Sequence, residues 1–124
     1  MANISGRLKL NNRKVQQLDQ AKITALGKTA ESLKTRIINE QVIPKDVGTL
    51  QDSLHVNYDN QKKGKVKLVM STPYARRLYY HPEYNFSTTD NQNARGEWFE
   101  PWISGKYKDF AKKRFAQFYK QEKE

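Results

Sequence analysis

The sequence predicts an α+β fold in which a long N-terminal helix packs on a small curved antiparallel sheet, with a C-terminal amphipathic helix and a long polar loop. Three patterns predict it: helical periodicity between about residues 12 and 41, strand alternation on both sides of a turn within residues 54–70, and a second helical stretch after residue 107. At 124 residues the chain has the size of one ordinary domain, so we expect a single domain over residues 1–124.

The longest predicted element is a helix from about Asn12 to Gln41. This segment contains no proline, and its apolar side chains recur at helical spacing. The positions are Val15, Leu18, Ile23, Leu26, Ala30, Leu33 and Ile37. At about 100° per residue they fall within an arc of about 140°, which is typical of an amphipathic helix. Pro44 predicts the end of the element, while Gly27 either weakens its middle or admits a close neighbour.

A β-hairpin is predicted after a short hinge at residues 45–53. Apolar and polar residues alternate in residues 54–58 and again in residues 65–70, and the stretch between them has turn chemistry. We expect the apolar face of the hairpin to lie against the long helix, while Lys65 and Lys67 face water.

Residues 73–80 read PYARRLYY and have an ambiguous period, so they form either a third strand or a short helix. This segment mixes basic and aromatic residues, as do surfaces that stack single-stranded nucleic acid. The favoured alternative is that Tyr74, Leu78 and one of the two later tyrosines pack inside the fold, while Arg76 and Arg77 face solvent or a neighbour.

The stretch from residue 81 to residue 97 is polar and has few groups to pack, so we expect a long loop. Loops beyond about 12–15 residues are usually functional or disordered. An aromatic segment, residues 98–103, follows as an anchor.

The closing helix is predicted from apolar residues on one face, namely Tyr107, Phe110, Ala111, Phe115 and Phe118. Arg114 falls inside the same apolar arc. Its guanidinium must therefore reach outward or find a partner across an interface.

Composition limits the partners of the chain. No cysteine is present, which excludes disulfides and thiolate metal sites and suits a reducing cytoplasm, and no apolar run is long enough to cross a bilayer. We therefore expect a soluble protein without membrane contact. The net charge is +10, with nine basic against three acidic residues in 1–45 and seven against three in 105–124. These two ends are either solvated helix surfaces or contacts with DNA or an acidic partner.

Little in the sequence indicates catalysis. The two histidines have no nucleophile or carboxylate at a catalytic spacing, and His55 is expected on the solvent face of a strand. The run from His81 to Glu83 could offer two groups to a metal, but a site needs three or four ligands. The six glycines form no phosphate-binding or dinucleotide motif. We predict no catalytic residue, no cofactor, no metal site and no enzymatic activity.

Three ordered segments of the chain carry a family resemblance. They are residues 42–53 (VIPKDVGTLQDS), residues 72–86 (TPYARRLYYHPEYNF) and residues 93–105 (NARGEWFEPWISG). With these segments the chain resembles the minor capsid proteins of tailed phages of Gram-positive bacteria. It is also similar to the wider group of phage neck and tail-completion proteins, in a pattern carried here by Asp46, Gly48, Thr49, Leu50, Ser53, Tyr74 and Ala75. Val47 and the run after Ala75 depart from that wider pattern, so the exact position in the neck stays open.

The resemblance implies a structural protein of the virion. Such a protein is a ring-forming neck subunit, a head–tail connector or a tail-completion protein, located at the head–tail junction after assembly in the host cytoplasm. The implied partners are further copies of the chain and the neighbouring connector and tail proteins, with non-specific contact to packaged DNA.

Tyrosine, tryptophan and arginine are typical of interface centres, which selects candidate contact residues in and around the resembling segments. The candidate subunit-interface residues are Tyr74, Arg76, Arg77, Tyr79, Tyr80, Tyr84, Phe86, Trp98 and Trp102. The candidate DNA-facing residues are Lys112, Lys113 and Arg114. The alternative function is a basic phage-encoded accessory protein that binds nucleic acid.

Overall fold

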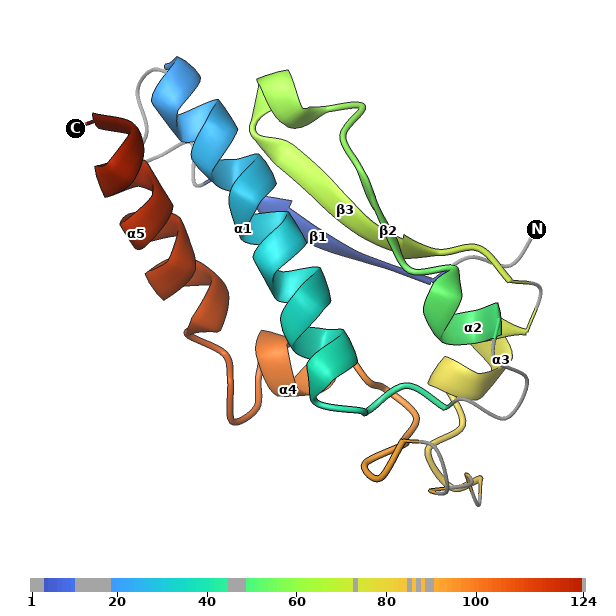
Figure 1. Ribbon diagram of the computed structural model, residues 1–124. Helices are drawn as coiled ribbons and strands as arrows, with labels where there is room; N and C mark the ends of the chain where they lie inside the picture. The colour runs from blue at the N-terminus through green and yellow to red at the C-terminus, as the bar shows by residue number, and fades with distance from the viewer. Residues whose placement is uncertain are drawn as a thin grey trace.

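The computed structural model of the chain combines a small sheet with two long helices and several short ones (Figure 1). It describes residues 4–10, 19–44, 49–72, 74–84, 86, 88 and 91–123. In chain order the elements are β1 (Ile4–Lys9), α1 (Gln20–Asn39), α2 (Thr49–Asp52), β2 (His55–Asn57), the 3-10 helix η1 (Gln61–Lys63), β3 (Lys65–Met70), α3 (Ala75–Tyr79), α4 (Glu100–Ile103) and α5 (Phe110–Lys123).

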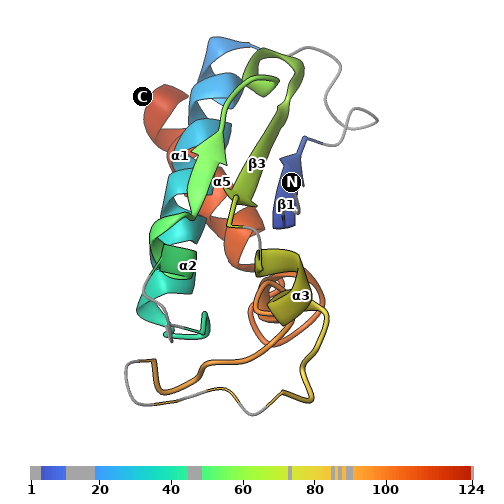
Figure 2. The same ribbon diagram turned by 90° about the vertical axis from the view of Figure 1, so that its right-hand side faces the viewer.

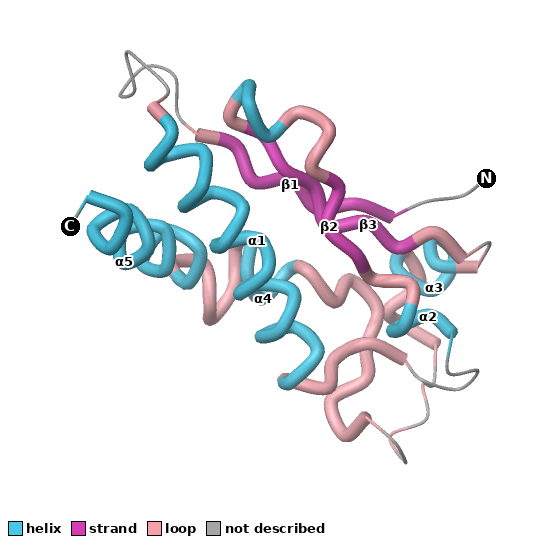
Figure 3. Tube along the Cα trace, turned by 45° about the horizontal axis from the view of Figure 1, so that its top comes forward, coloured by secondary structure: helices cyan, strands magenta, loops and turns pink. Residues whose placement is uncertain are grey.

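The fold is α+β, as the sequence predicts. α1 lies against one face of the sheet, and α5 runs alongside α1 (Figures 1 and 3). The opposite face of the sheet is turned toward the viewer in Figure 2, and no described helix lies in front of the strands there. Within the described part of the chain, helices therefore cover one face of the sheet.

Three antiparallel strands form the sheet, in the order β1-β3-β2. The pairing of β2 with β3 confirms the predicted hairpin. The sequence-based prediction lacks β1, because Gly6 occupies the middle of its inward face and hides the alternation of Ile4 and Leu8 with polar residues. The ring of Phe99 lies 3.7 Å from the position that a Cβ atom of Gly6 would take. A methyl group at that position would make ordinary van der Waals contact with the ring, so Phe99 packs closely over the strand at Gly6.

α1 confirms the predicted long helix but begins later. Asp19 has extended backbone angles, and its carboxylate accepts a hydrogen bond of 2.8 Å from the amide of Lys22, so it caps the helix start. Prediction and structure therefore differ at this end, and the predicted Val15 and Leu18 lie outside the described residues. The buried residues of the helix are Ala25, Leu26, Gly27, Thr29, Ala30, Leu33 and Ile37.

The turn after β2 docks on α1 through Gly27. The side-chain amide of Gln61 donates a hydrogen bond of 2.9 Å to the carbonyl oxygen of Ile23. A Cβ atom on Gly27 would lie only 2.6 Å from that amide nitrogen. The glycine thus admits a close neighbour, one of the two roles that the sequence allows.

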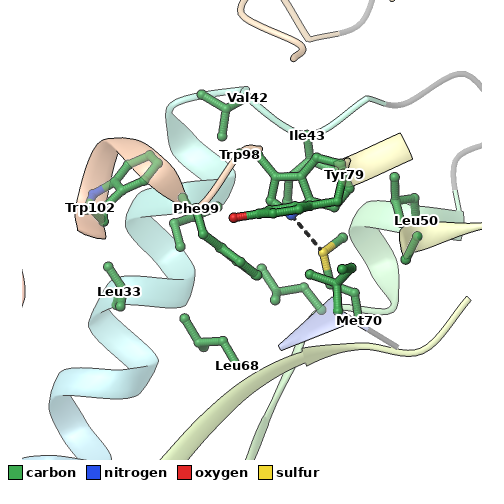
Figure 4. Packing of buried hydrophobic residues seen from close by; sticks show 14 residues of the cluster. Leu33, Val42, Ile43, Leu50, Leu68, Met70, Tyr79, Trp98, Phe99 and Trp102 are labelled. Atoms are coloured by element: carbon green, nitrogen blue, oxygen red, sulfur yellow. Dashed lines mark hydrogen bonds between the residues drawn. The ribbon is translucent and has the colours of Figure 1, made fainter. Parts of the chain in front are cut away.

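An aromatic cluster fills the core at the end of the molecule where α1 terminates (Figure 4). Trp98 is completely buried, and its indole N–H points at the sulfur of Met70 at 3.1 Å. The ring of Tyr79 stands edge-on to that of Trp98, with centroids 4.9 Å apart. Phe99 and Trp102 complete the cluster against Leu33 and the strands.

A smaller, aliphatic cluster lies toward the start of α1. Its buried members are Leu10, Leu26, Ala30 and Val66. Phe115 of α5 covers it but stays half-buried, and no described residue of α5 is fully buried. α5 is therefore an outer helix, as its single apolar face predicts.

The segment 73–80 contains a short helix, α3, and not a third strand. The predicted loop at 81–97 has no helix or strand in its described part, but the expectation that it has little to pack is wrong for residues 91–97. Asn91 is buried and donates hydrogen bonds of 2.7 Å to the Ile43 carbonyl and 2.8 Å to the Gln51 side chain. The end of the loop is thus held against the segment that follows α1.

Candidate functional site

Three of the predicted interface residues lie inside the chain. Tyr79 and Trp102 are each 7% exposed, and Trp98 is 0% exposed. They form the aromatic cluster with Phe99 and Met70, so their rings already have partners within the fold. We therefore correct the prediction and remove these three residues from the candidate interface.

The remaining candidates lie on or beside α3. Arg76, Arg77 and Tyr80 are exposed, with Tyr80 60% exposed, and Tyr84 follows them at the surface. The guanidinium of Arg76 lies over the ring of Tyr80, 5.9 Å from its centroid. We call Arg76, Arg77, Tyr80 and Tyr84 the aromatic–arginine surface.

The two other candidates are less accessible. Tyr74 is half-buried and packs against the aromatic cluster, as one of the sequence-based alternatives requires. Phe86 is half-buried as well, and its ring lies 6.3 Å from that of Tyr84. Tyr74 directly precedes α3, and Phe86 contacts Tyr84, so both residues lie next to the aromatic–arginine surface.

The turn after α3 holds Tyr84, at one edge of this surface, through contacts of His81. His81 stacks on Tyr84 with ring centroids 4.7 Å apart, and its Nδ1 atom lies 2.7 Å from the carboxylate of Glu83. The hydrogen bond from His81 lowers the pKa of the Glu83 carboxyl. The pair holds the Tyr84 ring in place, and it offers two groups to a metal, short of a full ligand set.

A second surface is an apolar groove beside the outer edge of β1. It has a volume of about 340 Å³ and contains the 61% exposed side chain of Ile103 at its rim. Its apolar lining includes Leu8, Leu33, Phe99, Trp102, Ile103 and Ala111. The sequence-based prediction lacks this groove because it lacks β1. The alternation of Ile4, Gly6 and Leu8 is the signal that could have revealed it.

Comparisons of the chain with protein-family models, curated proteins and solved structures found no match. Among the described helices, none combines the length and the apolar character needed to cross a bilayer. Within the same described part of the chain, no three histidine, cysteine or carboxylate residues lie close enough together to hold a metal ion.

The predicted DNA-facing residues of α5 divide into two kinds. Lys112 and Lys113 are exposed. Arg114 is half-buried, with its Nε atom donating a hydrogen bond of 3.0 Å to Ser32 and its guanidinium 4.7 Å from the ring centroid of Phe118. Arg114 thus finds a partner on α1 of its own chain, and not across an interface between chains, which leaves the two lysines as accessible charges.

The two histidines lie on different parts of the surface. His55 is exposed on β2, as predicted, and its Nδ1 atom lies 2.8 Å from the carbonyl oxygen of Ser53. His81 belongs to the turn after α3, where it contacts Glu83. Among the described residues, His55 thus contacts a backbone carbonyl and His81 contacts a carboxylate.

Proposed function

We propose that this chain is a structural subunit of a tailed-phage neck, a head–tail connector or tail-completion protein that forms a ring between head and tail. The observation that carries the proposal is the aromatic–arginine surface. It exposes Tyr80 and two arginines within the segment 72–86 that resembles phage minor capsid proteins. Tyrosine and arginine are enriched at the centres of protein interfaces, and the ring of Tyr80 is 60% exposed beneath the guanidinium of Arg76.

A closed ring needs two different surfaces on each subunit, because each copy contacts one neighbour with one face and the next neighbour with another. The aromatic–arginine surface and the groove beside β1 share no residue. One is rich in protruding rings and the other is concave and apolar. This pair of unlike surfaces fits a head-to-tail contact between copies of the chain.

The role proposed is one of assembly, without catalysis or a cofactor. It is supported by the exposure of Arg76, Arg77 and Tyr80 outside the aromatic cluster. In the proposed neck, the subunit is part of the virion and contacts connector and tail proteins above and below.

The test is the mass of the purified chain across a range of concentrations, alone and with phage connector assemblies, at physiological salt. We expect a closed ring, or a monomer that joins a ring on the connector. Tyr80→Ser should weaken this association at least about tenfold, since interface tyrosines are often hot spots. Tyr58→Ser is the matched control, because Tyr58 is 42% exposed but binds Glu31 of its own chain.

A second function, a nucleic-acid-binding accessory protein, is favoured by the exposed Lys112 and Lys113 on a chain of net charge +10. The same measurement separates the two. A monomer at all concentrations that ignores connectors and binds DNA would replace the neck proposal with this one.

A further inference from the structure

The open face of the sheet carries four cations in register. Arg7 of β1 lies directly opposite Lys67 of β3, and Lys9 lies opposite Lys65. Their inward neighbours, such as Val66 and Leu68, are buried, so the alternation of the strands turns the four charges away from the helices. This is the face seen in Figure 2. We call Arg7, Lys9, Lys65 and Lys67 the cationic sheet face.

This arrangement destabilises the sheet. Side chains directly opposite each other in an antiparallel pair have Cβ atoms about 4.5–5.5 Å apart, and like charges at that distance repel. None of the four cations forms an ion pair or a side-chain hydrogen bond with another described residue. The remaining outward positions of the strands hold Ser5, His55, Asn57 and Val69, which bring no negative charge to the face.

Three cations of the helices have counter-charges within the chain. Lys28 of α1 contacts Glu122 of α5 at 2.5 Å, and Lys123 contacts Asp19 at 3.5 Å. Arg36 pairs with Glu40 at 3.0 Å. Lys112 and Lys113 of α5, like the four cations of the sheet, form no ion pair with another described residue. The sheet is distinguished by the facing register of its like charges.

Protection of a sheet edge does not explain the pattern. Lysine on an edge strand prevents pairing with another chain, and this could account for Arg7 and Lys9 on β1. Lys65 and Lys67 lie on β3, however, which is the central strand and has both edges paired. Two of the four charges therefore need another reason.

We propose that the cationic sheet face binds the phosphate backbone of double-stranded DNA without reading its sequence. Charges two residues apart on a strand are about 7 Å apart, so the four cations form a dense, flat array. A DNA duplex has a matching density, with one negative charge per about 1.7 Å of its axis.

An acidic protein partner fits this face less well. Lysine is depleted at the centres of protein interfaces, where aromatic residues and methionine are enriched. The face has three lysines and one arginine, and no aromatic residue other than His55 lies at its outward strand positions. The inference does not rest on the proposed neck role, because the isolated chain is expected to bind DNA whether or not it forms a ring.

The test measures the affinity of the full chain for a fluorescent DNA duplex of mixed sequence as a function of salt. Four phosphate contacts predict a slope of about −3.6 in a plot of log affinity against log salt, which is roughly a 100-fold loss between about 50 and 200 mM. The sheet variant combines Arg7→Gln, Lys9→Gln, Lys65→Gln and Lys67→Gln. We expect it to lose most of this affinity and most of the slope.

The matched control removes four exposed charges outside the strands, through Lys62→Gln, Lys106→Gln, Lys108→Gln and Lys120→Gln. It has the same net charge as the sheet variant. We expect it to keep the slope and to bind DNA nearly as well as the wild type. The sheet variant should unfold at the same or a higher temperature than the wild type, because it loses like-charge repulsion, so weak binding would not reflect a failure to fold.

Two results would overturn the proposal. Equal losses in both variants would mean that DNA is attracted by net charge and not by this face. Polyglutamate that competes as well as DNA at equal charge concentration would point to an acidic protein as the partner. The mass measurement proposed for the ring is unaffected by either result, so the two proposals can fail separately.

Discussion

The two ends of the hydrophobic core differ in size and in chemistry. The aromatic cluster combines Trp98, Tyr79, Phe99 and Trp102 with buried residues from α1, α2 and the strands. The aliphatic cluster has four buried residues, and the groups around it, such as Phe115, are half-buried. The facing cations Lys9 and Lys65 directly precede Leu10 and Val66, two members of this aliphatic cluster, in the sequence. The difference indicates that the aromatic end supplies the stability that tolerates unpaired charge at the other end.

The largest expected effect is at the aromatic end. Trp98→Ala removes a fully buried ring and leaves a cavity among residues that cannot all collapse, so we expect a loss of about 3–5 kcal/mol in the free energy of unfolding. Urea titration followed by circular dichroism measures it. Trp98→Phe should recover part of the loss. A loss below about 1 kcal/mol for the alanine variant would show that the aromatic cluster does not dominate stability.

Leu26→Ala tests the aliphatic end. Leu26 is 2% exposed, but its half-buried neighbours can move into the space, so we expect a loss near the lower limit for such changes, about 2 kcal/mol. The same urea titration applies. If this variant lost as much stability as Trp98→Ala, the proposed contrast between the two ends would be wrong.

A third prediction concerns the loop held against the aromatic end. Asn91→Ala leaves the Ile43 carbonyl without its buried donor, and we expect a loss of about 1–3 kcal/mol in the free energy of unfolding. Asn93→Ala is the control, because Asn93 donates to the Glu40 carbonyl at 2.8 Å from an exposed position. Equal losses in the two variants would mean that burial of Asn91 contributes nothing.

The smallest expected effect has the opposite sign. Lys65→Thr removes one of two facing cations and should stabilise the fold by about 0.2–1 kcal/mol at low salt, with the gain vanishing as salt screens the repulsion. Thermal unfolding at two salt concentrations measures this. Lys62→Thr, in η1 and without a partner across a strand, should change stability little at either concentration.

Periodicity predicts much of the fold. The long helix, the hairpin and the closing helix each have enough apolar residues for their spacing to be recognised. β1 has six residues, as β3 has, but its central inward position is a glycine, and Phe99 from a distant segment packs over it. The glycine therefore weakens the alternation of Ile4 and Leu8, which is the local signal of the strand.

Composition predicts the candidate site less well, because it does not separate inner from outer aromatic residues. Tyr79 is 7% exposed and Tyr80 is 60% exposed, although they are adjacent. The separation follows from α3, whose helical period places Ala75 and Tyr79 on the same buried side. Once the segment is known to be helical, its period predicts that Tyr79 is buried and Tyr80 is exposed.

The pairing of distant segments also has a consequence for how fast the protein folds. β1 finds its partner on β3 some 60 residues later, with Ile4 opposite Met70, and Lys28 contacts a glutamate 94 residues away. Contacts of such long sequence separation require costly loop closure before they stabilise anything. During synthesis, the apolar face of α1 therefore stays exposed to solvent until both β3 and α5 have been made. We expect slow folding for a domain of this size, and a nascent chain that is a good substrate for chaperones.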